Sequence, residues 1–222
     1  MVKTLDQAAI ALRKAYSGVT IDPLREYLDP TDVDSAYQIQ ALNTDFWVGE
    51  GRRIVGRKVG LTAKSVQAQM GVDQSDFGVL FQDMEVADRG ILPVDRVIQP
   101  RAEAEVALIL HEDLPVGEVS QEELELAVGE VAAAIEIVDS RIADWKISFA
   151  DTVADNGSSA MFTLSTKRLP LADLDLWSCG MVLEVNGEVA SVGAGAACLG
   201  HPITAATWLA NTLASRGQPM RK

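Results

Sequence analysis

PRAEAEVALIL, residues 100–110, is the stretch from which the fold of this chain can be worked out. Two glutamates, Glu103 and Glu105, stand two residues apart, and an apolar run from Val106 to Leu110 follows at once. Such a run predicts a strand that enters a hydrophobic core. Residues i and i+2 of a strand point to the same face, about 6.6 Å apart at about 3.3 Å per residue. The stretch therefore predicts two carboxylates on one face of a core strand.

Two carboxylates so arranged can bend toward one small ion, and magnesium or manganese prefers such oxygen ligands. An edge strand with a solvated polar face would show the same pattern. A third glutamate, Glu136, lies inside the apolar segment VAAAIEIV. Because burying an unpaired carboxylate costs several kcal/mol, we expect Glu136 to be protonated, bound to a metal, or ion-paired with Arg141 or Arg101. Three glutamates without a histidine or cysteine cluster favour a hard cation over zinc.

Lys58 and Asp76 are two further candidates for chemistry. Lys58 lies between apolar residues and close to Gly56 and Gly60, where it could bind an anion or act as an acid or base. A lysine that snorkels from a sheet surface would show the same pattern. Asp76 precedes an aromatic residue and a glycine, and its alternative is a turn aspartate. DTVADNGSS, residues 151–159, predicts a polar loop that either binds a ligand or is an ordinary connection.

Composition limits the class of protein and its partners. A length of 222 residues is enough for one large domain or one domain with a small appendage. The composition, 48% hydrophobic and 23% charged, is typical of a globular protein with a sizeable core. The formal net charge of −13 repels phosphate backbones and anionic lipids, so neither nucleic acid nor a membrane is an expected partner. An anionic substrate would need a local positive charge or a metal. With two cysteines, Cys179 and Cys198, at no metal-type spacing, a reducing cytoplasm is the expected location.

The chain reads as helices first and a strand-rich core afterwards. Residues 1–50 predict a small helical region, with a capping box from Thr4 to Gln7 and a second helix from near Thr31. Residues 51–222 predict the core, with helices over Glu123–Ala133 and Pro202–Ser215. Its expected strands are IVGRKVGL, FGVLF, GILPV, EVALIL, AAIEIV and a hairpin in MVLEVNGEVAS with Asn186-Gly187 as its turn. This arrangement is an α+β pattern.

Six stretches taken together resemble the hydratase and decarboxylase branch of the fumarylacetoacetate hydrolase superfamily. They are GRKVGLT (56–62), GVDQSDFGVLF (71–81), QPRAEAEVALIL (99–110), AIEIVDSRI (134–142), DTVADNGSS (151–159) and LGHP (199–202). The resemblance covers essentially the whole chain, in order and at similar spacing. It implies a mixed β-roll core of that type with the small helical region at the N-terminus.

The resemblance also implies a site and its cofactor. The residues that match the family's ligands for Mg²⁺ or Mn²⁺ are Glu103, Glu105 and Glu136. The residues that match its acid, base or substrate-contact positions are Lys58, Asp76 and Ser158. No organic cofactor is implied. Family members usually continue with a Gly-rich strand segment that helps to close the roll, and that segment is expected to be missing from this chain.

The activity implied by the resemblance is hydration of a small anionic 2-hydroxy-2,4-dienoate to a 4-hydroxy-2-oxo acid, in meta-cleavage catabolism of aromatic or steroid compounds. Two alternatives remain open. The first is a metal-dependent decarboxylase of a 2-oxo-3-enedioate (4-oxalocrotonate), and the second is a non-catalytic subunit of a pathway complex. The resemblance further implies a homo-oligomer that can associate with a neighbouring aldolase or decarboxylase of the pathway.

Overall fold

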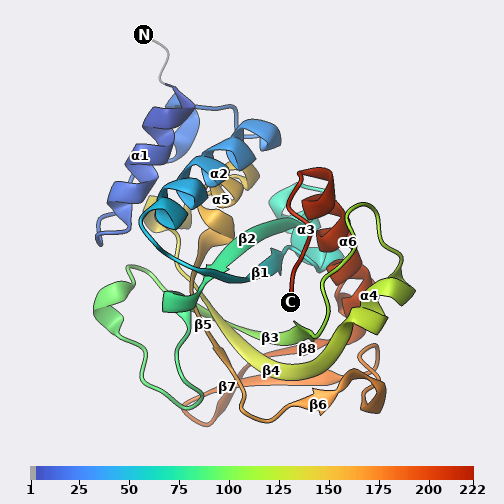
Figure 1. Cartoon of the computed structure of the whole chain (residues 1–222). Helices are drawn as coiled ribbons and strands as arrows, with labels where there is room; N and C mark the ends of the chain where they lie inside the picture. The colour runs from blue at the N-terminus through green and yellow to red at the C-terminus, as the bar shows by residue number, and fades with distance from the viewer. Residues whose placement is uncertain (1–3) are drawn as a thin grey trace. The chain divides into compact units, whose positions relative to one another are not determined.

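The computed structural model describes residues 4–222 (Figure 1), so the first three residues of the predicted helical region lie outside it. The chain divides into two compact units. The first unit comprises Met1–Gly60, Met70–Ala102 and Glu136–Thr163, and the second comprises Leu61–Gln69, Glu103–Ile135 and Leu164–Lys222. This division differs from the expected split at residue 50, because the N-terminal helices cluster with later strands of the chain.

Helices and strands are mixed along the chain, as the α+β prediction requires. The helices are α1 (Leu5–Ala15), α2 (Val33–Gly49), α3 (Lys64–Met70), α4 (Gln121–Ala127), α5 (Phe149–Ala154) and α6 (Pro202–Ser215). The strands are β1 (Ile54–Gly60), β2 (Asp76–Phe81), β3 (Arg101–Leu110), β4 (Val128–Val138), β5 (Ser159–Leu164), β6 (Leu169–Pro170), β7 (Gly180–Val185) and β8 (Glu188–Ala194). Short 3-10 helices occur at Leu24–Glu26, Gln82–Met84, Val94–Arg96, Ala143–Trp145, Asn156–Ser158, Leu171–Asp173 and Gly195–Ala197. No helix among residues 4–222 is long and apolar enough to cross a membrane.

The helices of the first unit begin where their capping residues predict. Thr4 and Gln7 form a reciprocal capping box at the start of α1, which buries a face of small and aliphatic side chains. Asp32 caps α2 by accepting a hydrogen bond from the Ser35 N–H. In Figure 1, α1 lies beside α2, and α2 lies beside α5. Both predicted N-terminal helices are therefore confirmed.

The first unit joins its helices to a two-stranded sheet through Gln40. β1 and β2 pair in antiparallel register, with Lys58 opposite Gly78 and Gly60 opposite Asp76. The buried Gln40 amide, on α2, donates to the carbonyls of Phe77 in β2 and Val153 in α5, both at 2.9 Å. One side chain thereby satisfies two buried carbonyls and ties helices to sheet.

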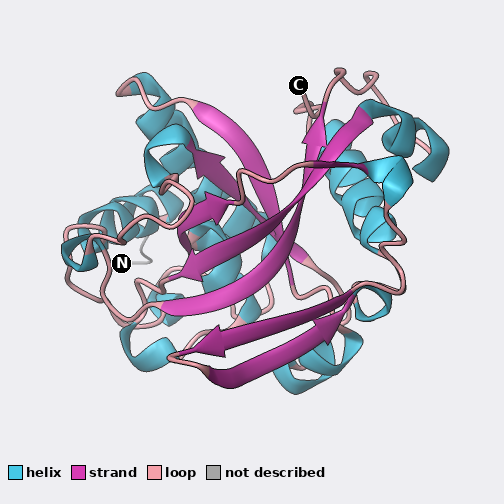
Figure 2. Ribbon diagram, turned by 90° about the horizontal axis from the view of Figure 1, so that it is seen from below, coloured by secondary structure: helices cyan, strands magenta, loops and turns pink. Residues whose placement is uncertain are grey.

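The remaining strands form a second sheet and a hairpin. β3, β4 and β5 are neighbours in that order, and β6 also pairs with β4. β7 and β8 form the predicted hairpin, which Figure 2 shows as a pair of antiparallel arrows. Its turn residues Asn186 and Gly187 have φ of 55° and 84°, as a two-residue turn with two left-handed positions requires.

Two predicted elements are wrong in part. The helix expected over Glu123–Ala133 is α4 only as far as Ala127, and β4 begins at Val128. Gly129 and the β-branched valines favour a strand, and that strand pairs with β5 and β3. The strand expected at GILPV is an irregular segment that leads into the 3-10 helix Val94–Arg96, and Pro93 has no N–H to donate to a sheet.

We predict that α4 contributes to the core of the second unit through Leu124 and not through Leu126. Leu124 is 1% exposed inside a cluster with Val119, Val128 and Ile203, whereas Leu126 is 70% exposed. Leu124→Ala should lower the free energy of unfolding by about 2–5 kcal/mol. Leu126→Ala on the same helix should change it by less than about 0.5 kcal/mol. Urea unfolding followed by circular dichroism measures both, and equal losses would contradict this packing.

Candidate active site

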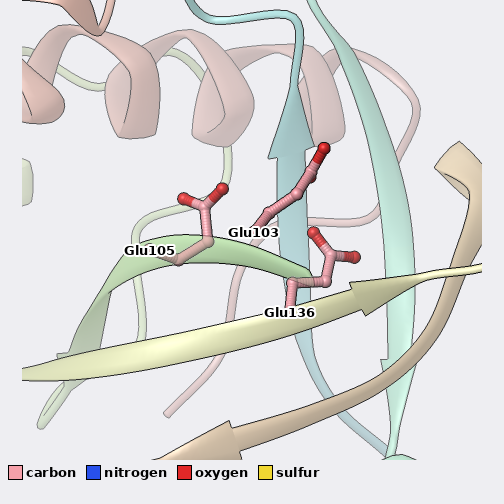
Figure 3. Close-up of side chains that lie close together, drawn as sticks. All are labelled: Glu103, Glu105 and Glu136. Carbon is pink, nitrogen blue, oxygen red and sulfur yellow. The ribbon is translucent and has the colours of Figure 1, made fainter. Parts of the chain in front are cut away.

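Three glutamates on neighbouring strands bring their carboxylates together (Figure 3). Glu103 and Glu105 lie on β3, and Glu136 lies on β4, which pairs with β3. Each offers one carboxylate oxygen, and these oxygens lie within 4.8 Å of one another. The side chains project from the same side of the two strands. A set of oxygen ligands without nitrogen or sulfur fits a hard divalent cation, as the sequence predicts.

Glu136 is the buried member of the set, at 5% exposure. The Ser159 hydroxyl donates to its Oε1 at 2.6 Å, and the Lys58 ammonium lies 3.4 Å from its Oε2. Both partners come from the first unit, to which Glu136 itself belongs. The carboxylate is therefore both hydrogen-bonded and ion-paired, and this offsets the cost of burying its charge.

Neither arginine expected as the partner of Glu136 has that role. The Arg141 Nε donates to Asp155 Oδ1 at 2.7 Å in a fully buried pair. The Arg101 guanidinium lies 4.1 Å from the centre of the Trp145 ring. That interpretation is thus wrong about the residue, because proximity in sequence does not identify the strand that faces a buried carboxylate.

Lys58 is enclosed on β1 and does not snorkel from a surface, since its side chain is 10% exposed. Its ammonium donates to the Gly157 carbonyl at 3.0 Å and also faces Glu136. A cation with a fixed position beside a carboxylate can bind an anionic group or move a proton.

Asp76 opens β2 and is 1% exposed, so it is a buried strand residue and not the alternative turn aspartate. Burial raises the pKa of Asp76, the nearby charge of Lys58 lowers it, and Glu136 raises it again. Within residues 4–222 its Oδ1 has no hydrogen-bond partner. A Cβ at Gly60, opposite it in the register, would lie 2.0 Å from that oxygen, so only glycine fits there. A buried carboxyl with a raised pKa beside a lysine is a candidate for proton exchange.

The loop Asn156–Ser158 approaches Lys58 in a strained conformation. Its three residues have φ of 59°, 61° and 56°, and two of them are not glycine. The Asn156 amide accepts from the Val79 N–H at 2.7 Å and donates to the Val79 carbonyl at 2.9 Å, as a neighbouring strand would. A Cβ on Gly78 would lie 2.3 Å from the Asn156 carbonyl oxygen. β2 and this loop are therefore in direct backbone contact.

Ser158 is buried in that loop, and its hydroxyl has no hydrogen-bond partner in the described part of the chain. The stretch DTVADNGSS is not one polar loop as expected, because its first four residues complete α5 and its last residue begins β5. Ser159, which binds Glu136, escaped the sequence analysis. The sequence indicates Ser159 only by its position next to Ser158. The strand register decides which of the two adjacent serines faces Glu136, and the sequence does not give that register.

A cavity of about 440 Å³ in the first unit is a separate feature. Tyr16, Trp47, Phe81 and Arg141 are among its lining residues, and it also touches Ser159. None of the three glutamates lines it, and neither does Lys58 or Asp76. The cavity therefore reaches the site only through residues beside it, such as Ser159.

No family model matches the chain. The chain is 50% identical over 217 residues to 2-keto-4-pentenoate hydratase 1 of Dechloromonas aromatica (strain RCB), covering 97% of this chain and 82% of that protein. It is similar to the structure of 4-oxalocrotonate decarboxylase from Pseudomonas putida G7 complexed with magnesium and adipate, at a TM-score of 0.89 and 32% identity over 98% of this chain and 84% of that one. Fumarylpyruvate hydrolase from Pseudomonas aeruginosa in complex with Mn2+ and pyruvate shares the fold at a TM-score of 0.51, with 14% identity over 72% and 71% of the two chains.

We predict that Asp76 destabilises the metal-free fold at high pH. Because burial raises the pKa of Asp76, the folded protein binds more protons than the unfolded chain, and stability is lost as pH rises through the folded pKa. Asp76→Asn should therefore raise the Tm, relative to the unmodified chain, more at about pH 8 than at about pH 4. Calorimetry with a chelator measures this difference.

Asp29 provides a control of opposite sign. Hydrogen bonds from the side chain and backbone of Thr31 lower the pKa of this exposed carboxyl. Its contribution is present at high pH and is lost as pH falls, so Asp29→Asn should cost more stability at about pH 8 than at about pH 4. The same pH trend in both variants would contradict the raised pKa of Asp76.

Proposed function

This chain belongs to the 2-keto-4-pentenoate hydratase family of the fumarylacetoacetate hydrolase superfamily, and on that premise we propose that it adds water to a 2-hydroxy-2,4-dienoate. The product would be a 4-hydroxy-2-oxo acid. The α+β fold predicted from the sequence agrees with that of its structural relatives. The observation that carries the proposal is the carboxylate set Glu103, Glu105 and Glu136, adjoined by Lys58 and Asp76.

The three glutamates would bind Mg²⁺ or Mn²⁺. Their oxygens are close enough to share one ion, and the exposed Glu103 leaves an approach for a ligand from solvent. A divalent cation, when bound, would supply Lewis-acid polarisation of the substrate's carboxylate and 2-oxygen. Its charge would also offset the repulsion between an anionic substrate and a chain of net charge −13.

Proton transfer and contact with the substrate would fall to Lys58, Asp76 and Ser158. Conversion of the 2-hydroxydienoate to a 2-oxo-enoate needs a proton donor and an acceptor, and Lys58 and Asp76 are the two groups suited to these steps. Asp76 has the raised pKa that such exchange requires, and Lys58 adds a positive charge beside the reacting anion. The Ser158 hydroxyl would contact substrate or the added water, because it has no partner among residues 4–222. Water would then add to the far alkene carbon.

The decarboxylase activity is the second candidate, since the related decarboxylase has a similar fold. Identity favours hydration, at 50% to a hydratase against 32% to that decarboxylase. A dioate substrate would also need a basic group for its second carboxylate. Residue spacing alone does not identify such a group in this chain.

The setting of the enzyme belongs to the same proposal. We expect it to work in the cytoplasm as a homo-oligomer, in meta-cleavage catabolism. A neighbouring aldolase that consumes the 4-hydroxy-2-oxo acid, or a decarboxylase, is the expected partner. Both of its cysteines are free, as a reducing compartment would leave them.

Removing the buried ligand should abolish metal-dependent turnover. Glu136→Gln keeps the shape and loses the charge, so both Mn²⁺ binding and hydration of 2-hydroxypenta-2,4-dienoate should be lost. The assay follows the diene absorbance with Mg²⁺, with Mn²⁺ and with a chelator, and calorimetry measures Mn²⁺ binding. Glu130→Gln, an exposed glutamate on the same strand, is the matched control and should keep both properties. Undiminished turnover in Glu136→Gln would refute the metal assignment, and carbon dioxide release from a 2-oxo-3-enedioate without diene hydration would favour the decarboxylase.

Lys58 should matter to turnover more than to metal affinity. Lys58→Met keeps the aliphatic stem and removes the ammonium, so kcat should fall by about 100-fold or more if Lys58 takes part in proton transfer. Mn²⁺ affinity should stay the same or rise, because a positive charge 3.4 Å from Glu136 is lost. Lys14→Met, at an exposed lysine of α1, is the control. Weakened Mn²⁺ binding with an unchanged kcat would remove Lys58 from the chemistry.

A further inference from the structure

We infer that Asp139 is a positioning residue that fixes the three metal-binding glutamates relative to one another. This inference rests on the proposed metal site, because it concerns how the chain prepares that site. Asp139 is not one of the grouped carboxylates and does not contact a candidate catalytic side chain in any hydrogen bond described for it. Its role follows from the backbone segments that it joins.

Asp139 binds backbone groups on two sides. It is 2% exposed, and its Oδ2 and Oδ1 accept from the N–H groups of Ile98 and Gln99 at 2.9 Å and 2.6 Å. Its own N–H donates to the Ser158 carbonyl at 2.7 Å. Hydrogen bonds to a carboxylate are roughly twice as strong as those between neutral groups. One residue therefore connects the approach to β3, the exit from β4 and the strained loop at Lys58.

Gln99 reinforces the same junction. Its side-chain amide donates to the carbonyls of Ser140 and Ile142 at 2.8 Å and 2.6 Å, and its own carbonyl accepts from the Trp145 indole at 3.0 Å. The Arg101 guanidinium then lies over the Trp145 ring. The segment before β3 is thus fastened to the segment after β4 by side chains from both.

The hydrogen bonds of Asp139 and Gln99 lie close in sequence to the three glutamates, so they bear on how the metal ligands are placed. Gln99 lies two residues before the start of β3 and four residues before Glu103, and Asp139 comes directly after the end of β4, three residues after Glu136. A slip of one residue in the pairing of β3 would turn Glu103 and Glu105 to the opposite face of the sheet. The two hydrogen bonds to Asp139 oppose that slip at the end of the strand nearest the glutamates. Asp139 therefore holds the strand register that keeps Glu103 and Glu105 on the same face of the sheet as Glu136.

The test is Mn²⁺ affinity in Asp139→Asn, measured by calorimetry and by the loss of the free-ion electron paramagnetic resonance signal. Asparagine offers one oxygen to two N–H donors and turns an N–H toward the other. Loss of a group that orients metal ligands typically weakens binding by about 10–100-fold, and we expect a loss of that size here. Excess Mn²⁺ should restore much of the turnover lost at limiting metal.

Asp175→Asn is the matched control. Asp175 also accepts from two backbone N–H groups, those of Trp177 and Ser178, at 3.1 Å and 3.2 Å, but in an exposed loop of the second unit. Its removal should leave Mn²⁺ affinity unchanged. If Asp139→Asn does not fold, Gln99→Met tests the same junction with its volume kept, and Mn²⁺ affinity should fall in the same direction.

A lowered Tm with unchanged Mn²⁺ affinity in Asp139→Asn, or in Gln99→Met where that variant replaces it, would overturn the positioning role and leave only a structural one. Failure of the unaltered chain to bind Mn²⁺ would instead overturn the proposed metal site, and this inference with it. The two failures are distinguishable because the first occurs on a chain that binds metal normally.

Discussion

A buried carboxylate needs partners, and much of the candidate site follows from how Glu136 finds them. At 5% exposure it has a serine hydroxyl on one oxygen and the Lys58 ammonium near the other. A buried ion pair seldom adds net stability over apolar packing, so its presence in a strand of this kind points to function. Glu103 and Glu105 add two further negative charges beside it, which a divalent cation would balance.

Backbone geometry gives these side chains their fixed positions. Gly60 and Gly78 allow Asp76 and the loop Asn156–Ser158 to approach β1 and β2 more closely than any Cβ would permit. The Asn156 amide substitutes for a strand neighbour of β2, and the left-handed φ values of the loop are the strain that this substitution requires. As a result, the Lys58 ammonium and the carboxylates of Asp76 and Glu136 lie close together, and each side chain has restricted freedom to move.

Features that depend on local chemistry could be predicted from the sequence, and features that depend on tertiary pairing could not. The capping box at Thr4, the Asn186-Gly187 turn and α6 were predictable because each depends on local chemistry. The end of α4 was not, because the change from helix to strand at Val128 depends on the pairing of β4 with β3 and β5. Glu-x-Glu and the buried Glu136 indicated a metal site, since spacing and apolar surroundings are visible in a sequence. The partners of Glu136 were not visible, because they come from β1 and β5 and depend on tertiary pairing.

Anomalous scattering from crystals of the chain soaked with Mn²⁺ would locate the metal site directly. We expect a single strong peak among the carboxylate oxygens of Glu103, Glu105 and Glu136, at separations of about 2.1 Å as for a small hard cation with oxygen ligands. We also expect Lys58 to remain beside Glu136. A peak elsewhere, or no peak at concentrations that support turnover, would show that these carboxylates are not the metal site.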